Sequence, residues 1–149
     1  LKAIRLKSAQ SVYKHSEVES GEVGTTFKNN GNETRIEFVQ NTFNNFAGVF
    51  GVQSNIFNFS ALGEEAFLPE TRNSAQALFA FEELKFDNSK LNFGLRGESN
   101  RIKPIANSNF TATEEKSFFL GSAAVGYLYN LSSEWSVSSQ VAYSEKAPN

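Results

Sequence analysis

The stretch KLNFGLRGE, Lys90–Glu98, alternates apolar and polar side chains at every step. Leu91, Phe93 and Leu95 share one parity of the sequence. The other parity holds small, polar or charged side chains: Asn92, Gly94, Arg96 and Glu98. Successive side chains of a strand point to opposite faces, so this stretch predicts a strand with one apolar face and one wet face.

Three short turns separate the predicted strands at regular intervals: Asn41–Asn45, Asp87–Ser89 and Asn130–Glu134. They lie about 45 residues apart, and longer polar segments lie between them. We interpret the longer segments as three loops: His15–Thr26, Asn58–Asn73 and Ser99–Lys116. Short turns that alternate with long loops are typical of the wall of an outer-membrane β-barrel.

Between these segments the pattern predicts about seven strands, an all-β antiparallel up-and-down meander: Leu1–Lys14, Thr34–Gln40, Phe46–Ile56, Ser74–Phe86, Lys90–Glu98, Ser117–Asn130 and Trp135–Tyr143. The fourth element is ambiguous. Phe79 and Phe81 form its apolar parity, but propensity also allows a helix over Ala75–Leu84. Because bacterial single-chain barrels have an even number of strands, we expect residues 1–149 to be one part of a larger barrel wall.

Composition excludes several classes of function. The formal charge of −2 provides no basic surface for nucleic acid, and no apolar run is long enough for a transmembrane helix. The chain has no Cys and one His, and it lacks the spacing of a nucleophile elbow or a metalloprotease helix. We therefore expect neither an enzyme nor a bound cofactor.

Aromatic side chains cluster near the three short turns: Phe43, Phe46, Phe86, Tyr129 and Trp135. Amphipathic and aromatic rings are enriched where a membrane wall meets water. These five residues are therefore the predicted aromatic girdle, which would contact outer-membrane lipid.

Two groups of side chains are candidates for binding a substrate or a metal ion. His15, Glu17 and Glu19 would project to one side of an extended segment, where they could approach one cation. Glu64 and Glu65 follow Gly63, and a tight turn there could point a carboxylate toward a bound ion. The alternative is that both groups belong to ordinary solvated loops.

Four charged residues lie on the polar parity of predicted strands: Arg35, Glu37, Arg96 and Glu98. In a barrel this parity faces the lumen, where an unpaired charge would be costly. We expect these side chains to form ion pairs with one another across strands and with whatever fills the lumen.

The segment from Tyr143 to Asn149, YSEKAPN, resembles the strand end of TonB-dependent outer-membrane receptors, and GYLYNLSSEW before it resembles the hairpin leading into that strand. Phe59–Pro69, Ala77–Glu83 and Gly94–Glu98 are similar to the middle of the barrel in the zinc-uptake branch. That branch can carry a His-rich loop, whereas His15 is the single histidine here.

The resemblance implies a bacterial outer-membrane barrel of about 22 strands that imports a nutrient, here a metal ion such as zinc or a metal complex. It also implies a plug domain inside the barrel and energy supplied by the TonB complex. Residues 1–149 contain no region resembling the plug, so the chain is interpreted as a partial barrel domain.

Two other classes are alternatives. A soluble β-sandwich would pack the apolar parity into a core and use its loops to bind a glycan or a protein. A porin or an adhesin translocator would use a different barrel. The small residues and paired charges of the polar parity favour a barrel lumen over the solvated face of a sandwich.

Overall fold

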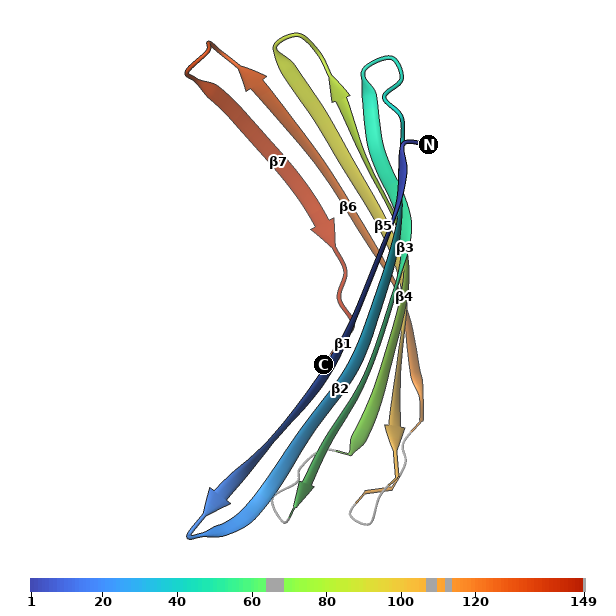
Figure 1. Cartoon of the computed structure of the whole chain (residues 1–149), viewed down its shortest axis with the longest axis vertical. Helices are drawn as coiled ribbons and strands as arrows, with labels where there is room; N and C mark the ends of the chain where they lie inside the picture. The colour runs from blue at the N-terminus through green and yellow to red at the C-terminus, as the bar shows by residue number, and fades with distance from the viewer. Residues whose placement is uncertain (64–68, 107–109, 112–113, 149) are drawn as a thin grey trace.

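The computed structural model describes residues 1–63, 69–106, 110–111 and 114–148. These residues form one antiparallel sheet in which every strand pairs with the next in sequence (Figure 1). The strands are β1 (Ala3–Glu19), β2 (Glu22–Val39), β3 (Phe46–Gly63), β4 (Glu70–Lys85), β5 (Ser89–Ile105), β6 (Lys116–Asn130) and β7 (Ser136–Ser144). The predicted all-β up-and-down meander is confirmed.

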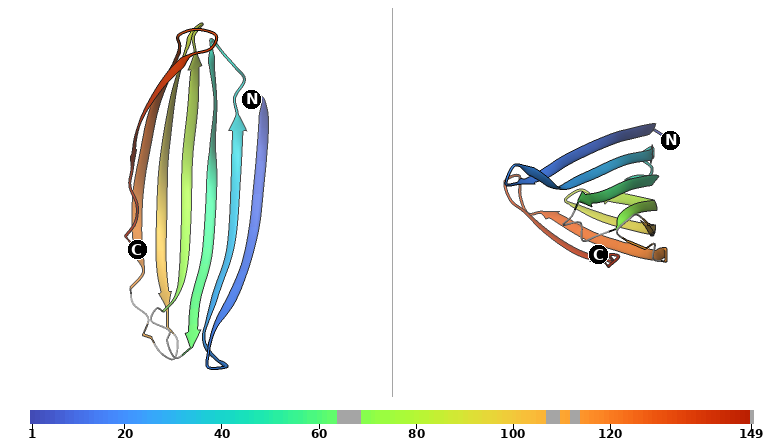
Figure 2. Two further views of the ribbon diagram at one scale, coloured as in Figure 1. Left: turned by 90° about the vertical axis from the view of Figure 1, so that its left-hand side faces the viewer. Right: turned by 90° about the horizontal axis from the view of Figure 1, so that it is seen from below.

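The sheet curls into an open trough, with β1 and β7 at its two edges (Figure 2). The three short turns lie together at one end, which we call the short-turn end. The turn between β1 and β2 lies at the opposite end, which we call the loop end (Figure 1). No helix in the described part of the chain could cross a membrane.

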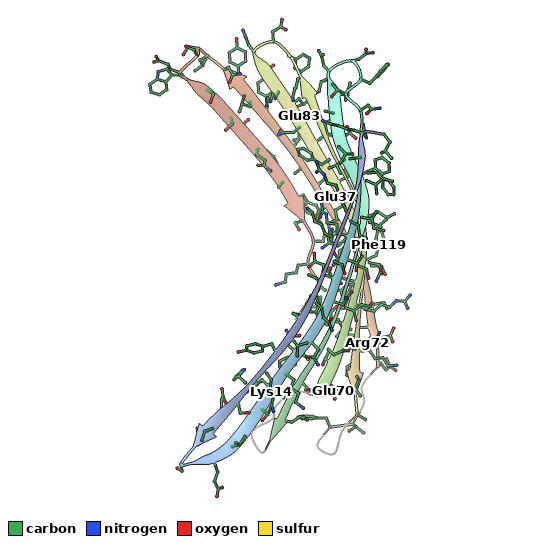
Figure 3. All side chains as sticks on the ribbon, in the orientation of Figure 1. Lys14, Glu37, Glu70, Arg72, Glu83 and Phe119 are labelled. Atoms are coloured by element: carbon green, nitrogen blue, oxygen red, sulfur yellow. The ribbon has the colours of Figure 1, made fainter. Side chains whose placement is uncertain are left out.

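Cross-strand pairing assigns each side chain to one of two faces, because directly opposite residues point the same way. Leu95 pairs with Ala80 on β4 and with Ala123 on β6, so these three share a face. By the same pairing Phe119 lies on this face, whereas Glu37 lies on the other. Figure 3 shows Phe119 on the convex side of the trough and Glu37 on the concave side, which defines the convex face and the concave face.

No second layer of structure covers the convex face in the described residues. Its apolar side chains remain open, with Leu95 61% exposed and Phe119 80% exposed. The buried hydrophobic residues of the described chain are two alanines, Ala61 and Ala77, so the sheet has no conventional core. The alternative of a soluble sandwich with an apolar core is therefore wrong.

The predicted loop His15–Thr26 is wrong, because β1 and β2 continue through it to a two-residue turn at Ser20 and Gly21. Both turn residues have positive φ, 50° and 89°, as tight hairpins prefer. The strands β1 to β5 have 16 to 18 residues, more than the roughly 9–11 that cross a bilayer. A strand that protrudes into water can be polar on both faces, so its sequence resembles a loop.

The other two predicted loops are too long for the same reason. The structure continues β3 to Gly63 and begins β4 at Glu70, inside the predicted loop Asn58–Asn73. Likewise, β5 extends to Ile105 within the predicted loop Ser99–Lys116. The helix considered for Ala75–Leu84 is wrong, since those residues pair on both sides as the central strand β4.

Candidate functional site

The concave face carries a network of charged and amide side chains centred on Glu37. Arg35 Nε donates to Glu37 Oε1 at 2.8 Å, Lys7 Nζ lies 3.6 Å from the same oxygen, and Arg5 Nη1 lies 3.8 Å from Glu37 Oε2. The Glu37 side chain is only 7% exposed. Three cations therefore surround a carboxylate that has little contact with water, and they offset the cost of its desolvation.

Gln53 on β3 extends the network toward β5. Its side-chain oxygen accepts from Arg96 Nη1 at 3.0 Å and from Arg35 Nη1 at 3.4 Å. Its amide nitrogen donates to Glu33 Oε1 at 2.9 Å. Arg96 also pairs with Glu98 on its own strand. One neutral amide thus joins charged side chains from two strands that are not neighbours.

A small residue on β4 leaves room for this bridge. Ala77 pairs with Gln53 on one side and with Glu98 on the other, and it is 5% exposed. The long side chain of Arg96 reaches from β5 to β3 past the position where β4 presents only a methyl group. A larger residue at 77 would occupy the path of the Arg96–Gln53 hydrogen bond.

The ring of Phe79 contacts one cation of the network, Arg35. Phe79 lies on the concave face, with the Arg35 guanidinium 3.9 Å from its ring centroid. Gly51 pairs with Phe79, and a Cβ at position 51 would come within 2.7 Å of the ring and would also meet the Ile36 carbonyl oxygen. Glycine here allows the ring to lie close to β3, where its face attracts the cation.

The aromatic parity of β4 therefore faces the concave side and not the convex side. Phe81 follows Phe79 on the concave face, whereas Leu78 and Ala80 take the convex positions. In β4 the apolar side chains of the convex face are Leu78 and Ala80, which are smaller than phenylalanine. The Leu78 residue is 67% exposed.

A second group of concave side chains, which we call the aromatic cradle, lies toward the loop end: Tyr13, His15, Phe27, Phe57 and Phe59. The rings of His15 and Phe27 are stacked with centroids 4.7 Å apart, and Tyr13 lies 5.4 Å from His15. Phe57 and Phe59 line a hollow of about 620 Å³ together with Asn29, Asn73 and Asn100. The side-chain oxygen of Asn100 is buried and makes no hydrogen bond with any of the described residues.

The structure places His15 and Glu17, two of the predicted metal ligands, on the same face of β1. His15 stacks on Phe27, while a register shift after Glu17 places Glu19 opposite Glu22 beside the turn. No group of three or more His, Cys, Asp or Glu side chains that could hold a metal ion occurs among the described residues. Glu64 and Glu65 lie outside the described residues, so their role stays a prediction.

The structure brings together the four predicted lumen charges, but their carboxylates pair along each strand. Arg35 bonds Glu37 and Arg96 bonds Glu98, each two residues apart. Sequence reasoning missed Arg5, Lys7 and Gln53. The hairpin turn at Ser20 and Gly21 would have revealed the first two, since it places Arg5 opposite Glu37 and Lys7 opposite Arg35.

The five predicted girdle residues occupy the short-turn end. Phe43, Phe86 and Trp135 lie in or beside the turns and are 74%, 53% and 71% exposed. Phe46 begins β3 and Tyr129 lies one residue before the end of β6, both on the convex face. Their contact with the membrane interface stays a prediction.

A family described as TonB dependent receptor-like, beta-barrel, has a model that matches residues 6–149. The match covers nearly the whole chain, from β1 to the tail after β7. No curated protein gives a significant match.

Proposed function

Because this chain belongs to the β-barrel family of TonB-dependent receptors, we propose that it forms a continuous part of the wall of a nutrient importer. Proteins of this family are located in the bacterial outer membrane and take up nutrients across it. Outer-membrane transporters of this kind close 22 strands around a plugged lumen. Seven strands would then supply about a third of that wall.

The observation that carries this proposal is that the two faces of one sheet present different side chains. The convex face presents uncovered apolar side chains, as lipid contact requires. The concave face presents a connected set of four cations and three carboxylates: Arg5, Lys7, Arg35, Arg96, Glu33, Glu37 and Glu98. We propose that this network contacts the plug domain, through which the TonB complex would act.

We propose that the loop end faces the outside of the cell and that its concave surface meets the nutrient. Longer strands and connections gather on the extracellular side of such barrels. The aromatic cradle and its neighbouring asparagines offer flat apolar surfaces beside amide groups. That combination suits an organic ligand better than a bare ion, because ring faces stack on organic groups and amides orient them.

For the substrate, we propose a metal complex with an organic ligand. The resemblance of Phe59–Pro69 to the zinc-uptake branch favours a metal, and the family as matched does not distinguish zinc from other nutrients. Because the described residues contain no cluster able to chelate zinc, the organic part of a complex would supply most of the contacts. Glu64 and Glu65 are the residues that we propose to contact the part of the complex that holds the metal.

Deletion of the intact receptor tests the transport proposal. We expect the deletion strain to accumulate less of one metal, measured by elemental mass spectrometry, and the intact gene to restore it. Loss of the TonB complex should produce the same deficit. Unchanged levels of every metal in the deletion strain would remove metal uptake from the proposal.

Calorimetry on the intact receptor tests the substrate contacts. A ferric catecholate complex is expected to bind more tightly than Zn²⁺ alone, and Glu64→Ala/Glu65→Ala should weaken binding of the complex about tenfold, or 1.4 kcal/mol. The control Glu114→Ala/Glu115→Ala removes the same charge from the next loop and should leave affinity unchanged. Tight binding of Zn²⁺ alone would contradict the proposed substrate class, and equal affinity of both variants would exclude Glu64 and Glu65.

A further inference from the structure

The convex face changes character along the strands. Its short-turn half is mostly apolar and includes one carboxylate, Glu82. Near the loop end it carries five basic side chains from four strands, which we call the basic band: Lys14, Lys28, Arg72, Arg101 and Lys103. Figure 3 labels Lys14 on β1 and Arg72 on β4, both toward the loop end of the trough. The band therefore extends across the sheet.

The register places like charges directly opposite one another within this band. Lys14 pairs with Lys28 across β1 and β2, and Arg72 pairs with Lys103 across β4 and β5. Arg101 shares a face with Lys103, two residues away on β5. Directly opposed like charges destabilise a sheet by themselves, so this arrangement calls for anions from outside the sheet.

Nothing in the described part of the chain neutralises the band. None of the five band residues lies within 4.0 Å of a described carboxylate. The ion pairs of the described residues lie on the concave face, and their cations are Arg5, Lys7, Arg35, Lys85, Lys90 and Arg96. Glu70 is the carboxylate that shares this part of the convex face among the described residues, and it makes no ion pair with them. Four of the five basic side chains are exposed, and Lys28 is half-buried.

The height of the band corresponds to the edge of the hydrocarbon layer. Arg101 lies ten residues beyond Leu91 on β5, and the convex side chains between them are Phe93, Leu95, Gly97 and Ser99. With about 3.3 Å per residue and a strand tilt of about 40°, that separation rises roughly 25 Å, the height of a typical lipid-facing band. Between the cations the convex positions are polar as well, with Asn30, Asn58 and Ser74 among them.

We propose that the basic band binds the phosphate groups of anionic lipids in the leaflet that surrounds the loop end. In the orientation proposed above this is the outer leaflet. Basic side chains at a membrane surface attract anionic headgroups, and the neighbouring amide and hydroxyl groups can donate to the same oxygens. The occupant is a lipid because the band shares the convex face with the exposed apolar side chains that would hold its acyl chains.

Native mass spectrometry of the intact receptor in dodecyl maltoside tests this site with diphosphorylated lipid A as the probe. We expect Lys14→Ser/Lys28→Ser/Arg72→Ser to reduce affinity for the probe at least tenfold. The matched control Lys2→Ser/Lys85→Ser/Lys90→Ser removes the same charge at the short-turn end and should keep parental affinity. Because the measurement is made in micelles, its result does not depend on transport or on which way the barrel faces.

A charge-conserving variant and a dephosphorylated lipid serve as two further controls. Lys14→Arg/Lys28→Arg should retain lipid binding, and heat-shifted migration on gels should show that every variant is folded. Dephosphorylated lipid A should bind weakly to all of them. Unchanged affinity of the triple serine variant, or equal binding of the dephosphorylated lipid, would overturn the proposal. It would also fail if inorganic phosphate alone competed at equal concentration, or if the band bound acidic polypeptide and not the lipid.

Discussion

The convex and concave faces are built from the same seven strands, yet they handle charge in opposite ways. On the concave face, cations and carboxylates from β1, β2 and β5 meet around Glu37 and Gln53. On the convex face, the central positions hold Leu, Val, Ala and Phe, and cations occur where the apolar band ends. Neighbouring residues of a strand therefore point into different environments. A charge on the concave face finds a partner of opposite charge, whereas a charge in the centre of the convex face finds none among the described residues.

The largest expected effect comes from adding a charge at the middle of the sheet. Ala123 lies on the convex face and Ala124 on the concave face of β6. Ala123→Arg should lower the free energy of unfolding by about 2–4 kcal/mol in phospholipid vesicles, because a cation near the bilayer centre loses its hydration. Urea titration of the intact receptor measures this change.

Ala124→Arg is the matched control for that substitution. Its side chain enters the wet face, so we expect a change smaller than about 1 kcal/mol, as near an interface. If the two substitutions destabilised the receptor equally, the assignment of the faces would be wrong.

A smaller effect is expected from filling the space under Phe79. Gly51→Ala forces a methyl group against the Phe79 ring and the Ile36 carbonyl, so it should cost about 1–3 kcal/mol of unfolding free energy. Gly94→Ala is the control, since a Cβ there meets nothing closer than 3.8 Å. We expect the control to change stability by less than about 0.5 kcal/mol. Similar costs for both would show that Gly51 is not required for the close approach of the ring.

The smallest effect tests the contact between Arg35 and Phe79. Arg35→Lys keeps the charge but loses the flat guanidinium, so it should cost about 0.5–1 kcal/mol in the same urea titration. Arg101→Lys on the convex face has no ring or carboxylate partner among the described residues and should be neutral. A neutral Arg35→Lys would mean that charge alone explains the role of this residue.

Period-two alternation predicted the strands and most of the two faces. In β5 it assigned the side chains correctly, because lipid and lumen demand opposite polarity at every step. It did not reveal where strands end. Beyond the membrane both faces of a strand meet water, so the polar residues of His15–Thr26 do not distinguish a protruding hairpin from a loop.

The alternating pattern alone does not predict the contacts within the concave network, because these also depend on the register between strands. The shared face of Arg35, Glu37, Arg96 and Glu98 was predictable from their parity alone. Gln53 was not, because its role depends on Ala77 being small on the strand between β3 and β5. Phe79 was assigned to the apolar parity of β4, but it lies on the concave face. Gly51 leaves room there for its ring, and the Arg35 guanidinium lies over that ring.

The central claim is that one face of this sheet contacts lipid and the other contacts water. A nitroxide label placed in turn at positions 92 to 97 of β5 in the reconstituted receptor tests it by its accessibility to oxygen and to a water-soluble nickel chelate. We predict that labels at 93, 95 and 97 are accessible to oxygen in the bilayer, and that labels at 92, 94 and 96 are not. Equal accessibility at all six positions, or alternation of the opposite phase, would contradict the account.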